Sequence, residues 1–320
     1  ELINHNRLKC RPPLPQREIE SIAKSVLKYP SNDALTETGN ADRFHARFGD
    51  VVRYAVEAKQ WLVADGGLWR PDNSGRVVEY MKDIARELKG AAANVTGKRR
   101  KGLEAWAKRS ESASTIHASL KLAQSIPGIP VNAEALDADP MLLALPNGVL
   151  DLSTGELLPH DQNLLLTRQA GPRWDPEAEC PRWLEFLDRI FTQEASLIAY
   201  LKRLFGYALT GKTSEQVFVL FHGNGRNGKS TLLLVLRKIL GDYARHAQPQ
   251  LLTESRYQGG PNPSLARLRG ARLVTTTETE ENQRLSESLV KQITGSDPIE
   301  VRGLYQDPFE FVPAFKIILA

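Results

Sequence analysis

The chain has 320 residues, of which 41% are hydrophobic and 25% charged, with a formal net charge of +4 and a sequence pI of about 9.0. This composition is ordinary for a globular protein. Its two cysteines, Cys10 and Cys180, lie far apart, which argues against a disulfide framework or a cysteine zinc site and favours a reducing compartment. The small basic excess permits a nucleic-acid partner without requiring one.

No segment of the sequence predicts a membrane span. The aliphatic run Leu232–Leu236 is far shorter than the roughly 20 residues that cross a bilayer. The chain does not open with the charged and apolar pattern of a signal peptide. We therefore expect a cytoplasmic protein with no membrane partner.

The first half of the chain is predicted to be a mixed α+β and helical region. Residues 31–44 are polar and are expected to form a linker or loop. The stretch WLVADGGLWRP (61–71) predicts a β-hairpin, and GKRRKG (97–102) is a compact basic run. The expected helices, judged mainly from apolar side chains three and four residues apart, are residues 12–30, 51–60, 76–90 and 103–126.

In the second half, strands and helices alternate. LPNGVLDLSTGELLPH (145–160) predicts a second hairpin that turns at Ser153-Thr154-Gly155. Two amphipathic helices are expected within 183–209. From about 205–215 onward, strand–loop–helix alternation predicts an α/β unit with a mostly parallel sheet. Its expected strands are 217–223, 271–277 and 315–320, with a helix at 283–293.

Residues 223–230, GNGRNGKS, fit the phosphate-loop pattern GxxxxGK(S/T) between an expected strand and an expected helix. Such a match arises by chance about once in a hundred chains of this length. Lys229 would neutralise the β- and γ-phosphates of ATP, and Ser230 would ligate Mg²⁺. The alternative is a glycine-rich structural turn. The residues expected to hold the nucleotide are Gly223, Asn224, Gly225, Arg226, Asn227, Gly228, Lys229, Ser230 and Thr231.

A phosphate loop needs a second strand that carries a carboxylate toward the magnesium ion and the attacking water. LVTTTETEE (273–281) is the candidate. We expect Glu278 to be the catalytic acid that holds Mg²⁺ through water, with Glu280 as the second choice. The alternative is that both glutamates lie on a solvated helix start, where acids favour the helix dipole.

These motifs, in this order, resemble the superfamily 3 helicase core of phage and plasmid primase–helicases, which has relatives in poxviruses and other large DNA viruses. The resemblance rests on GNGRNGKST (223–231) and on LARLRGARLVTTTETEE through FKIILA (265–320). It implies an α/β P-loop NTPase core of the AAA+ type, forming a ring that is usually hexameric. Such a ring uses ATP and Mg²⁺ to move 3′ to 5′ on single-stranded DNA. The family's usual first acidic position is Thr277 here, which leaves Glu278 to act alone.

The resemblance also implies how the chain is divided, with the core truncated at its C-terminal side. The family's sensor asparagine would directly follow Ala320, and the arginine finger is expected downstream. Arg267 or Arg269 could act on a neighbouring subunit, although ordinary surface arginines are the simpler interpretation. The implied segments are a helical end of a primase-associated module (1–30), a mixed α+β pre-helicase domain (31–170), a helical collar (171–210) and an incomplete P-loop ATPase core (211–320).

Residues 297–313, DPIEVRGLYQDPFEFVP, predict a hairpin with strands on either side of a Tyr-Gln-Asp-Pro turn. In the resembling family such a hairpin contacts DNA in the ring channel. Arg302, Tyr305 and Lys291 are the groups available for phosphate pairing and base stacking. Phe309 and Phe311 are expected in the core. The alternative is an ordinary structural hairpin.

Three functions are consistent with these patterns. The first is an ATP-dependent DNA helicase, the motor half of a primase–helicase whose primase domain lies upstream in the same polypeptide. The second is a P-loop phosphotransferase, which would need an arginine-rich lid and an acceptor pocket. The third is a DNA-binding assembly module with an incomplete ATPase. The helicase is favoured because the predicted hairpin and the preceding helical domain fit a phosphotransferase poorly.

Overall fold

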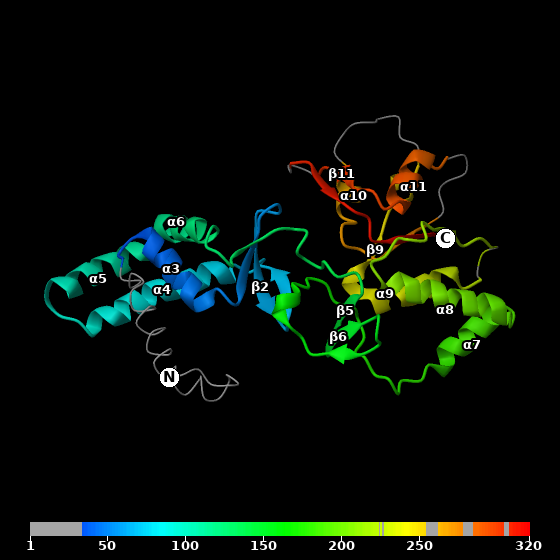
Figure 1. Cartoon of the computed structure of the whole chain (residues 1–320), viewed down its shortest axis with the longest axis horizontal. Helices are drawn as coiled ribbons and strands as arrows, with labels where there is room; N and C mark the ends of the chain where they lie inside the picture. The colour runs from blue at the N-terminus through cyan, green and yellow to red at the C-terminus, as the bar shows by residue number, and fades with distance from the viewer. Residues whose placement is uncertain (1–33, 224, 226, 254–261, 278–283, 304–306) are drawn as a thin grey trace, which may run out of the picture. The chain divides into compact units, whose positions relative to one another are not determined.

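The computed structural model of the chain describes residues 34–320, apart from 224, 226, 254–261, 278–283 and 304–306. The described residues form two compact units (Figure 1). The first comprises the described part of Glu1–Asp65 together with Trp69–Ala133, and the second comprises Gly66–Leu68 and Glu134–Ala320. The helix predicted at 12–30 lies outside the described residues.

The first unit packs helices against a four-stranded sheet of order β3-β2-β1-β4. Strand β1 runs antiparallel to β2 and parallel to β4. Phe44, Met81 and Trp106 are among the buried side chains of its core. The elements are α3 (Glu37–Phe48), β1 (Val52–Ala55), β2 (Gln60–Asp65), β3 (Leu68–Pro71), α4 (Arg76–Ala93), α5 (Gly97–Ser110), α6 (Ala113–Ala123) and β4 (Pro130–Val131).

Two predictions in the first unit are wrong. The expected linker at 31–44 contains the start of α3, which Thr36 caps with its side chain. The expected helix at 51–60 is instead β1 and the turn that leads into β2, with Val52 opposite Val63. Strand pairing with residues outside the local window outweighs helix propensity at this position.

The remaining predictions for this unit are confirmed or refined. β2 and β3 form the predicted hairpin at 61–71, and α4 covers the helix predicted at 76–90. The helix predicted at 103–126 is two helices, α5 and α6, because Ser112 starts a new helix by accepting a hydrogen bond from the Thr115 N–H. The basic run 97–102 forms the first turns of α5.

The second unit opens with a three-stranded antiparallel sheet and two helices. β6 and β7 form the hairpin predicted at 145–160. β5 pairs antiparallel with β6 and forms a second hairpin, which the sequence did not predict. The two helices predicted within 183–209 are confirmed. The elements are β5 (Leu142–Leu145), β6 (Gly148–Asp151), β7 (Leu157–Leu158), the 3-10 turn η1 (Gln162–Leu164), α7 (Pro181–Ile190) and α8 (Ala195–Leu209).

The α/β part follows and is built on a parallel sheet of order β8-β13-β10-β9. A separate antiparallel pair, β11 and β12, forms the hairpin predicted at 297–313. The elements are β8 (Phe218–Leu220), α9 (Lys229–Leu240), η2 (Gly241–Tyr243), β9 (Ala244–His246), η3 (Pro249–Leu251), α10 (Pro263–Ala266), β10 (Leu273–Thr276), α11 (Glu287–Thr294), β11 (Ile299–Val301), β12 (Phe309–Phe311) and β13 (Lys316–Leu319).

Alternate residues of the parallel strands enter two different cores. Leu273 and Ile318 pack with residues of α8 and α9 on one face of the sheet. Val274 and Ile317 pack with the β11–β12 hairpin and α11 on the other face. This alternation follows from the two-residue period of a strand, and both faces are covered, as a parallel sheet requires.

Strand β8 differs from its prediction in burial. The apolar run 217–221 favours a buried strand, but β8 lies at the edge of the four-stranded sheet and its Leu220 is 59% exposed. The fold is therefore a mixed α/β arrangement in which the predicted parallel sheet is confirmed. Among the described helices, none combines the length and apolar character needed to cross a bilayer.

Candidate functional site

The predicted phosphate loop lies between the carboxyl end of β8 and the first turn of α9. Strand β13 separates β8 from β10, and Leu220, Leu319 and Thr276 lie side by side in these three strands. The carboxyl ends of parallel strands meet at one edge of a sheet, which is where ligands bind in α/β folds. The residues that follow β8 and β10 therefore start from the same edge.

The loop is closed by contacts onto Gly223. The Lys229 Nζ donates a hydrogen bond to the Gly223 carbonyl oxygen at 2.7 Å. The Asn227 amide also lies against Gly223, because a Cβ at that position would be 2.2 Å from the Asn227 Nδ2. Ser230 and Thr231 are exposed at the start of α9. Gly225 is exposed as well, whereas Asn224 and Arg226 lie outside the described residues.

Helix α9 begins in a way that suits an anion. Its N-cap is Gly228, so no capping side chain bonds the first N–H groups of the helix. The positive end of the helix dipole and the N–H groups of the first helical turn attract phosphate oxygens. Lys229 stands at the first helical position and is half-buried. These groups fit a polyphosphate. The exposed Ser230 hydroxyl is suited to ligate a magnesium ion bound to that phosphate.

Helix α7 packs directly on the loop at Gly228. Gly228 has a φ of +85°, a conformation that side chains other than glycine rarely adopt. A Cβ added there would lie 2.8 Å from the Ile190 Cγ2 and 3.3 Å from the Phe186 ring. The glycine is thus required twice, by its backbone conformation and by its contact with α7. The sequence pattern indicated the first requirement but contained no signal for the second.

We expect Gly228→Ala to lower the free energy of unfolding by about 1–2 kcal/mol, because it combines a left-handed backbone with a clash against Ile190. Urea-induced unfolding measures this change. Gly225→Ala is the matched control, since a Cβ at Gly225 meets no atom within 4 Å. Equal stabilities of the two variants would show that α7 does not pack on the loop as described.

Strand β10 leads to the predicted acidic residues. Thr275 and Thr276 are buried at 1% exposure, so they fill the core of the sheet and do not line an open site. The Ala320 N–H donates to the Thr276 carbonyl oxygen at 3.0 Å, which fixes the end of β13 beside the end of β10. Glu278 and Glu280 lie outside the described residues, and their catalytic roles stay predictions.

The hairpin predicted at 297–313 is present, and some of its described side chains are buried in the core whereas others are exposed to solvent. Ile299 and Val301 are buried, as is Phe311, so one face of the hairpin belongs to the core. Arg302 directly follows β11 and is exposed, and Lys291 is exposed on α11. Tyr305 lies outside the described residues. The core position expected for Phe311 is confirmed, and Phe309 packs against the same core while partly exposed.

The two arginines considered for a role in a neighbouring subunit have different surroundings. Arg267 is exposed. The Arg269 guanidinium lies 5.3 Å from the centroid of the Phe309 ring, in the same chain. A stack of this kind holds the side chain on the hairpin. Arg269 therefore has a structural contact within its own subunit, in line with the simpler interpretation of this residue.

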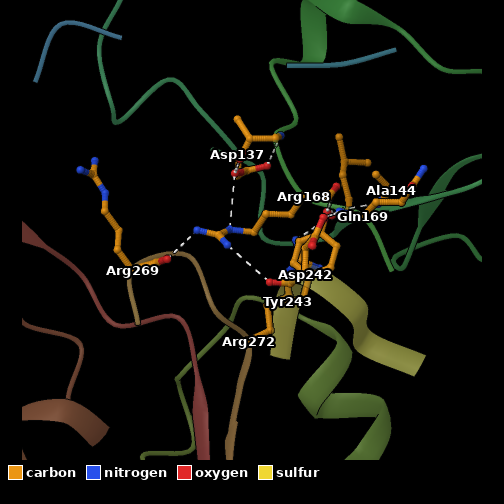
Figure 2. Close-up of polar contacts among 10 residues, drawn as sticks. Asp137, Ala144, Arg168, Gln169, Asp242, Tyr243, Arg269 and Arg272 are labelled. Carbon is orange, nitrogen blue, oxygen red and sulfur yellow. Dashed lines mark hydrogen bonds and ion pairs between the residues drawn. The ribbon is translucent and has the colours of Figure 1, made fainter. Parts of the chain in front are cut away.

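A polar cluster centred on Arg168 includes Tyr243 and Arg272, which directly precede β9 and β10 and so lie at the edge opposite the phosphate loop. Figure 2 shows the contacts of this cluster. The Arg168 Nη2 donates to the Arg269 carbonyl oxygen at 2.6 Å, and the Nε lies 3.8 Å from the Asp137 Oδ2. The Tyr243 hydroxyl donates to the Arg168 carbonyl oxygen and accepts from the Ala144 N–H. The cluster joins the β5–β6 region to the parallel sheet.

Two buried cations beside this cluster bind the end of α8. Arg272, 4% exposed, donates to the Leu209 carbonyl oxygen at 2.7 Å and to the Leu142 carbonyl oxygen at 2.6 Å. Lys316, 2% exposed, donates to the carbonyl oxygens of Thr210 and Lys212. Cations are favourable at the carboxyl end of a helix. These hydrogen bonds hold the end of α8 against the sheet.

Burial shifts the pKa values of these groups. Desolvation lowers the pKa of Lys316 to about 7, with a smaller contribution from the nearby Arg272 charge. Burial also lowers the pKa of Arg272, and it raises the pKa of the Tyr243 hydroxyl. No sequence pattern marked Lys316 or Arg272, because both look like ordinary polar residues at strand starts.

We expect the stability of the second unit to rise with pH above 7. The pKa of Lys316 is about 7 in the folded chain, whereas its ordinary value, expected in the unfolded chain, is 10.5. Between pH 7 and 10.5 the unfolded chain therefore binds more protons than the folded chain. Below pH 7 the folded chain therefore carries the full free-energy cost of burying the charged lysine. This cost falls as the pH rises and Lys316 loses its proton. Between pH 7 and 8.5 the gain should be about 1–2 kcal/mol.

Urea unfolding at several pH values tests this expectation. Lys316→Met should remove the rise, whereas Lys212→Met, on an exposed lysine, should keep it. A rise that persists in Lys316→Met would assign the pH dependence to another group.

Comparisons with known proteins match both units. The family described as "D5 N terminal like" matches residues 41–192, and a family of unknown function (DUF5906) matches residues 221–320. The second match includes the phosphate loop, β10 and the β11–β12 hairpin. The predicted likeness to the primase–helicase family is confirmed by these matches and by the viral relatives described next.

Among curated proteins, the chain is 31% identical over 188 residues to "Putative helicase L207/L206" of Acanthamoeba polyphaga mimivirus. It is 29% identical over 196 residues to "Putative helicase 121R" of Invertebrate iridescent virus 3, and 27% identical over 196 residues to "Putative primase C962R" of African swine fever virus (isolate Tick/Malawi/Lil 20-1/1983). Each match covers 58% of this chain but only 20–21% of the relative. The chain thus spans about a fifth of the length of these relatives.

Among solved structures, the chain is similar to the apo structure of the NrS-1 C terminal region (305-718). The TM-score is 0.47 and the sequence identity 14%, with 84% of this chain and 53% of that chain covered.

Proposed function

We propose that this chain, a relative of proteins named as helicases and primases in large DNA viruses, is the motor of an ATP-dependent DNA helicase. One observation carries the proposal. A GxxxxGKS loop joins β8 to α9 at the edge of a parallel sheet in which β13 separates β8 from β10. This strand order is typical of AAA+ ATPases, and it supports the P-loop NTPase core that the sequence resemblance implied.

In this proposal each loop residue has a distinct role. The backbone N–H groups of residues 223–231 surround the phosphates of ATP, and Lys229 neutralises the charge that develops on them. Ser230 holds Mg²⁺, which would neutralise phosphate oxygens when bound. Glu278 polarises the attacking water, with Glu280 as the second choice. The hydrogen bond from the Lys229 Nζ to the Gly223 carbonyl oxygen supports the loop assignment, because it holds the ammonium beside the first residue of the loop.

The β11–β12 hairpin is the proposed DNA-contacting element. Arg302 is exposed directly after β11, and Ile299, Val301 and Phe311 fix the strands of the hairpin in the core. Arg302 and Lys291 would pair with DNA phosphates, and Tyr305 would stack on a base. The same proposal includes a homo-oligomeric, hexameric ring, ATP at the subunit interfaces and a primase domain upstream. The whole would act in replication of phage, plasmid or other mobile-element DNA in the cytoplasm.

We expect Arg302→Ala to bind single-stranded DNA more weakly and with a shallower salt dependence. Loss of one phosphate contact lowers the slope of log K against log salt by about 0.7–1. A salt titration of binding to a labelled oligonucleotide measures the slope. Arg237→Ala, on an exposed arginine of α9, is the control and should keep the wild-type slope. An unchanged slope in Arg302→Ala would argue against contact at this hairpin.

ATP turnover distinguishes the helicase from the two alternatives. Phosphate release that increases with single-stranded DNA supports the helicase. Transfer of the phosphoryl group to a small acceptor, with no effect of DNA, would support a phosphotransferase. DNA binding without turnover would support an assembly module with an incomplete ATPase.

A further inference from the structure

A cavity of about 390 Å³ lies in the second unit, at the edge of the parallel sheet opposite the phosphate loop. Two of its lining residues, Tyr243 and Arg272, are buried and directly precede β9 and β10. The loop 211–214 after α8 and the segment 312–314 between β12 and β13 form other parts of its wall. The volume is within the range of small-molecule sites.

Two buried cations lie at this cavity. Arg272 lines it and is 4% exposed. Lys316 is 2% exposed and lies behind the wall, where its Nζ donates to the carbonyl oxygens of Lys212 and Ala314, two residues of the lining. Buried charges in proteins are normally paired with opposite charges. Among the residues that the structure describes, the acceptors of both cations are backbone carbonyl oxygens, and neither cation forms an ion pair with a carboxylate.

The acid nearest to these cations is bound to other groups. Asp137 is the only acid among the described residues of the lining. Its Oδ1 accepts from the Thr167 N–H at 2.7 Å, and its Oδ2 accepts from the Thr167 hydroxyl. A third cation, Arg168, has its Nε 3.8 Å from the same Oδ2 (Figure 2). Because Asp137 is shared with Arg168, it does not balance the charges of the two buried cations.

The wall segments of the cavity are joined to one another. The Gly211 N–H donates to the Pro140 carbonyl oxygen at 2.8 Å. The Thr213 hydroxyl donates to the Pro313 carbonyl oxygen at 3.4 Å. A site whose walls are already held in place loses little free energy to ordering when a ligand binds.

The exposed part of the lining supplies further groups for an anion. Lys212 and Ser214 are exposed on the loop 211–214, and Ser296 is exposed as well. Ammonium and hydroxyl groups donate hydrogen bonds to oxyanions. A phosphomonoester carries a charge of about −1.5 to −2 at pH 7, which matches two cations, whereas a carboxylate carries a single charge.

We propose that this cavity binds a phosphate dianion, free or as the monoester of a small molecule, with Arg272 and Lys212 contacting its oxygens. Lys316 contributes its charge from behind the wall. The cavity lies at the opposite edge of the sheet from the 223–230 loop, so this site is separate from the proposed ATP site and does not depend on the proposed function.

Calorimetry on Lys229→Ala tests the site, because this variant lacks the cation of the phosphate loop. The measurement is made below the pKa of Lys316, which is about 7, so that both buried cations are charged. Inorganic phosphate and ribose 5-phosphate should bind, and acetate, a monoanion, should not. Tighter binding of ribose 5-phosphate would identify the ligand as a phosphomonoester, and the reverse order would identify it as free phosphate.

Two further substitutions in the Lys229→Ala background locate the binding. Lys212→Met removes a charged donor and should weaken both phosphate probes about tenfold. Ser214→Asp adds a negative charge to the lining and should weaken them as well. Lys202→Met is the matched control, because Lys202 is an exposed lysine of α8 outside the lining, and it should leave both Kd values unchanged.

Three results would overturn the proposal and leave the proposed function standing. The first is that neither phosphate probe binds to Lys229→Ala, which would place any phosphate bound by the wild type on the 223–230 loop. The second is unchanged affinity in both Lys212→Met and Ser214→Asp. The third is acetate binding as tight as phosphate binding, which would exclude a site built for a dianion.

Discussion

Lys229→Ala should lower the rate of ATP turnover about 100-fold or more. Lys229 is the single cation of the phosphate loop among its described residues, and its Nζ lies 2.7 Å from the Gly223 carbonyl oxygen, at the start of the loop. In the proposed site it neutralises charge that grows as the terminal phosphate is transferred, and removal of one such group typically costs a factor of about 10²–10³. A coupled assay of phosphate release measures the loss.

The control for this variant is Lys238→Ala, because Lys238 is an exposed lysine in the last turn of the same helix. Its turnover should stay within twofold of wild type. Folding of Lys229→Ala is checked by urea unfolding. A well-folded Lys229→Ala that turns over ATP at the wild-type rate would exclude the 223–230 loop as the catalytic phosphate site.

Arg272→Met should lower the free energy of unfolding by about 3 kcal/mol. The guanidinium donates to the carbonyl oxygens of Leu209 and Leu142 and lies 4.5 Å from the centroid of the Tyr243 ring. Each hydrogen bond from a charged donor contributes about 1.5–3 kcal/mol. Burial lowers the pKa of Arg272, so the buried charge itself costs free energy, and Arg272→Met removes that cost. We therefore expect a loss smaller than the summed contribution of the two hydrogen bonds.

Urea unfolding measures the change, and amide exchange of β10 and β13 localises it to the parallel sheet. Arg267→Met is the control, since Arg267 is exposed and its loss should change stability by less than about 0.5 kcal/mol. A variant as stable as wild type would show that α8 does not depend on this cation.

The phosphate loop could be predicted because its signal is local. Strand, loop and helix follow each other within residues 217–240, and each step has its own residue pattern. The β11–β12 hairpin and β13 were predictable for the same reason. The segment 51–60 was not, because β1 is a strand only through its pairing with β2 and with β4, which lies about 75 residues downstream.

The surroundings of the loop could not be predicted from the sequence. The contact between α7 and Gly228 depends on how two separate elements pack, and the amphipathic pattern of α7 does not reveal its neighbour. Lys316 is buried because the end of α8 supplies carbonyl oxygens to it from about 105 residues upstream. The predictions for Glu278, Glu280 and Tyr305 concern positions outside the described residues and still rest on the sequence.

The most direct test of the nucleotide site is a crystal structure of the protein with Mg²⁺ and a non-hydrolysable ATP analogue. We predict that the β- and γ-phosphates lie against the N–H groups of the 223–230 loop. The Lys229 Nζ should exchange its hydrogen bond to Gly223 for one to a phosphate oxygen. Phosphates bound elsewhere on the chain, with the Lys229–Gly223 hydrogen bond still in place, would contradict the proposed ATPase site.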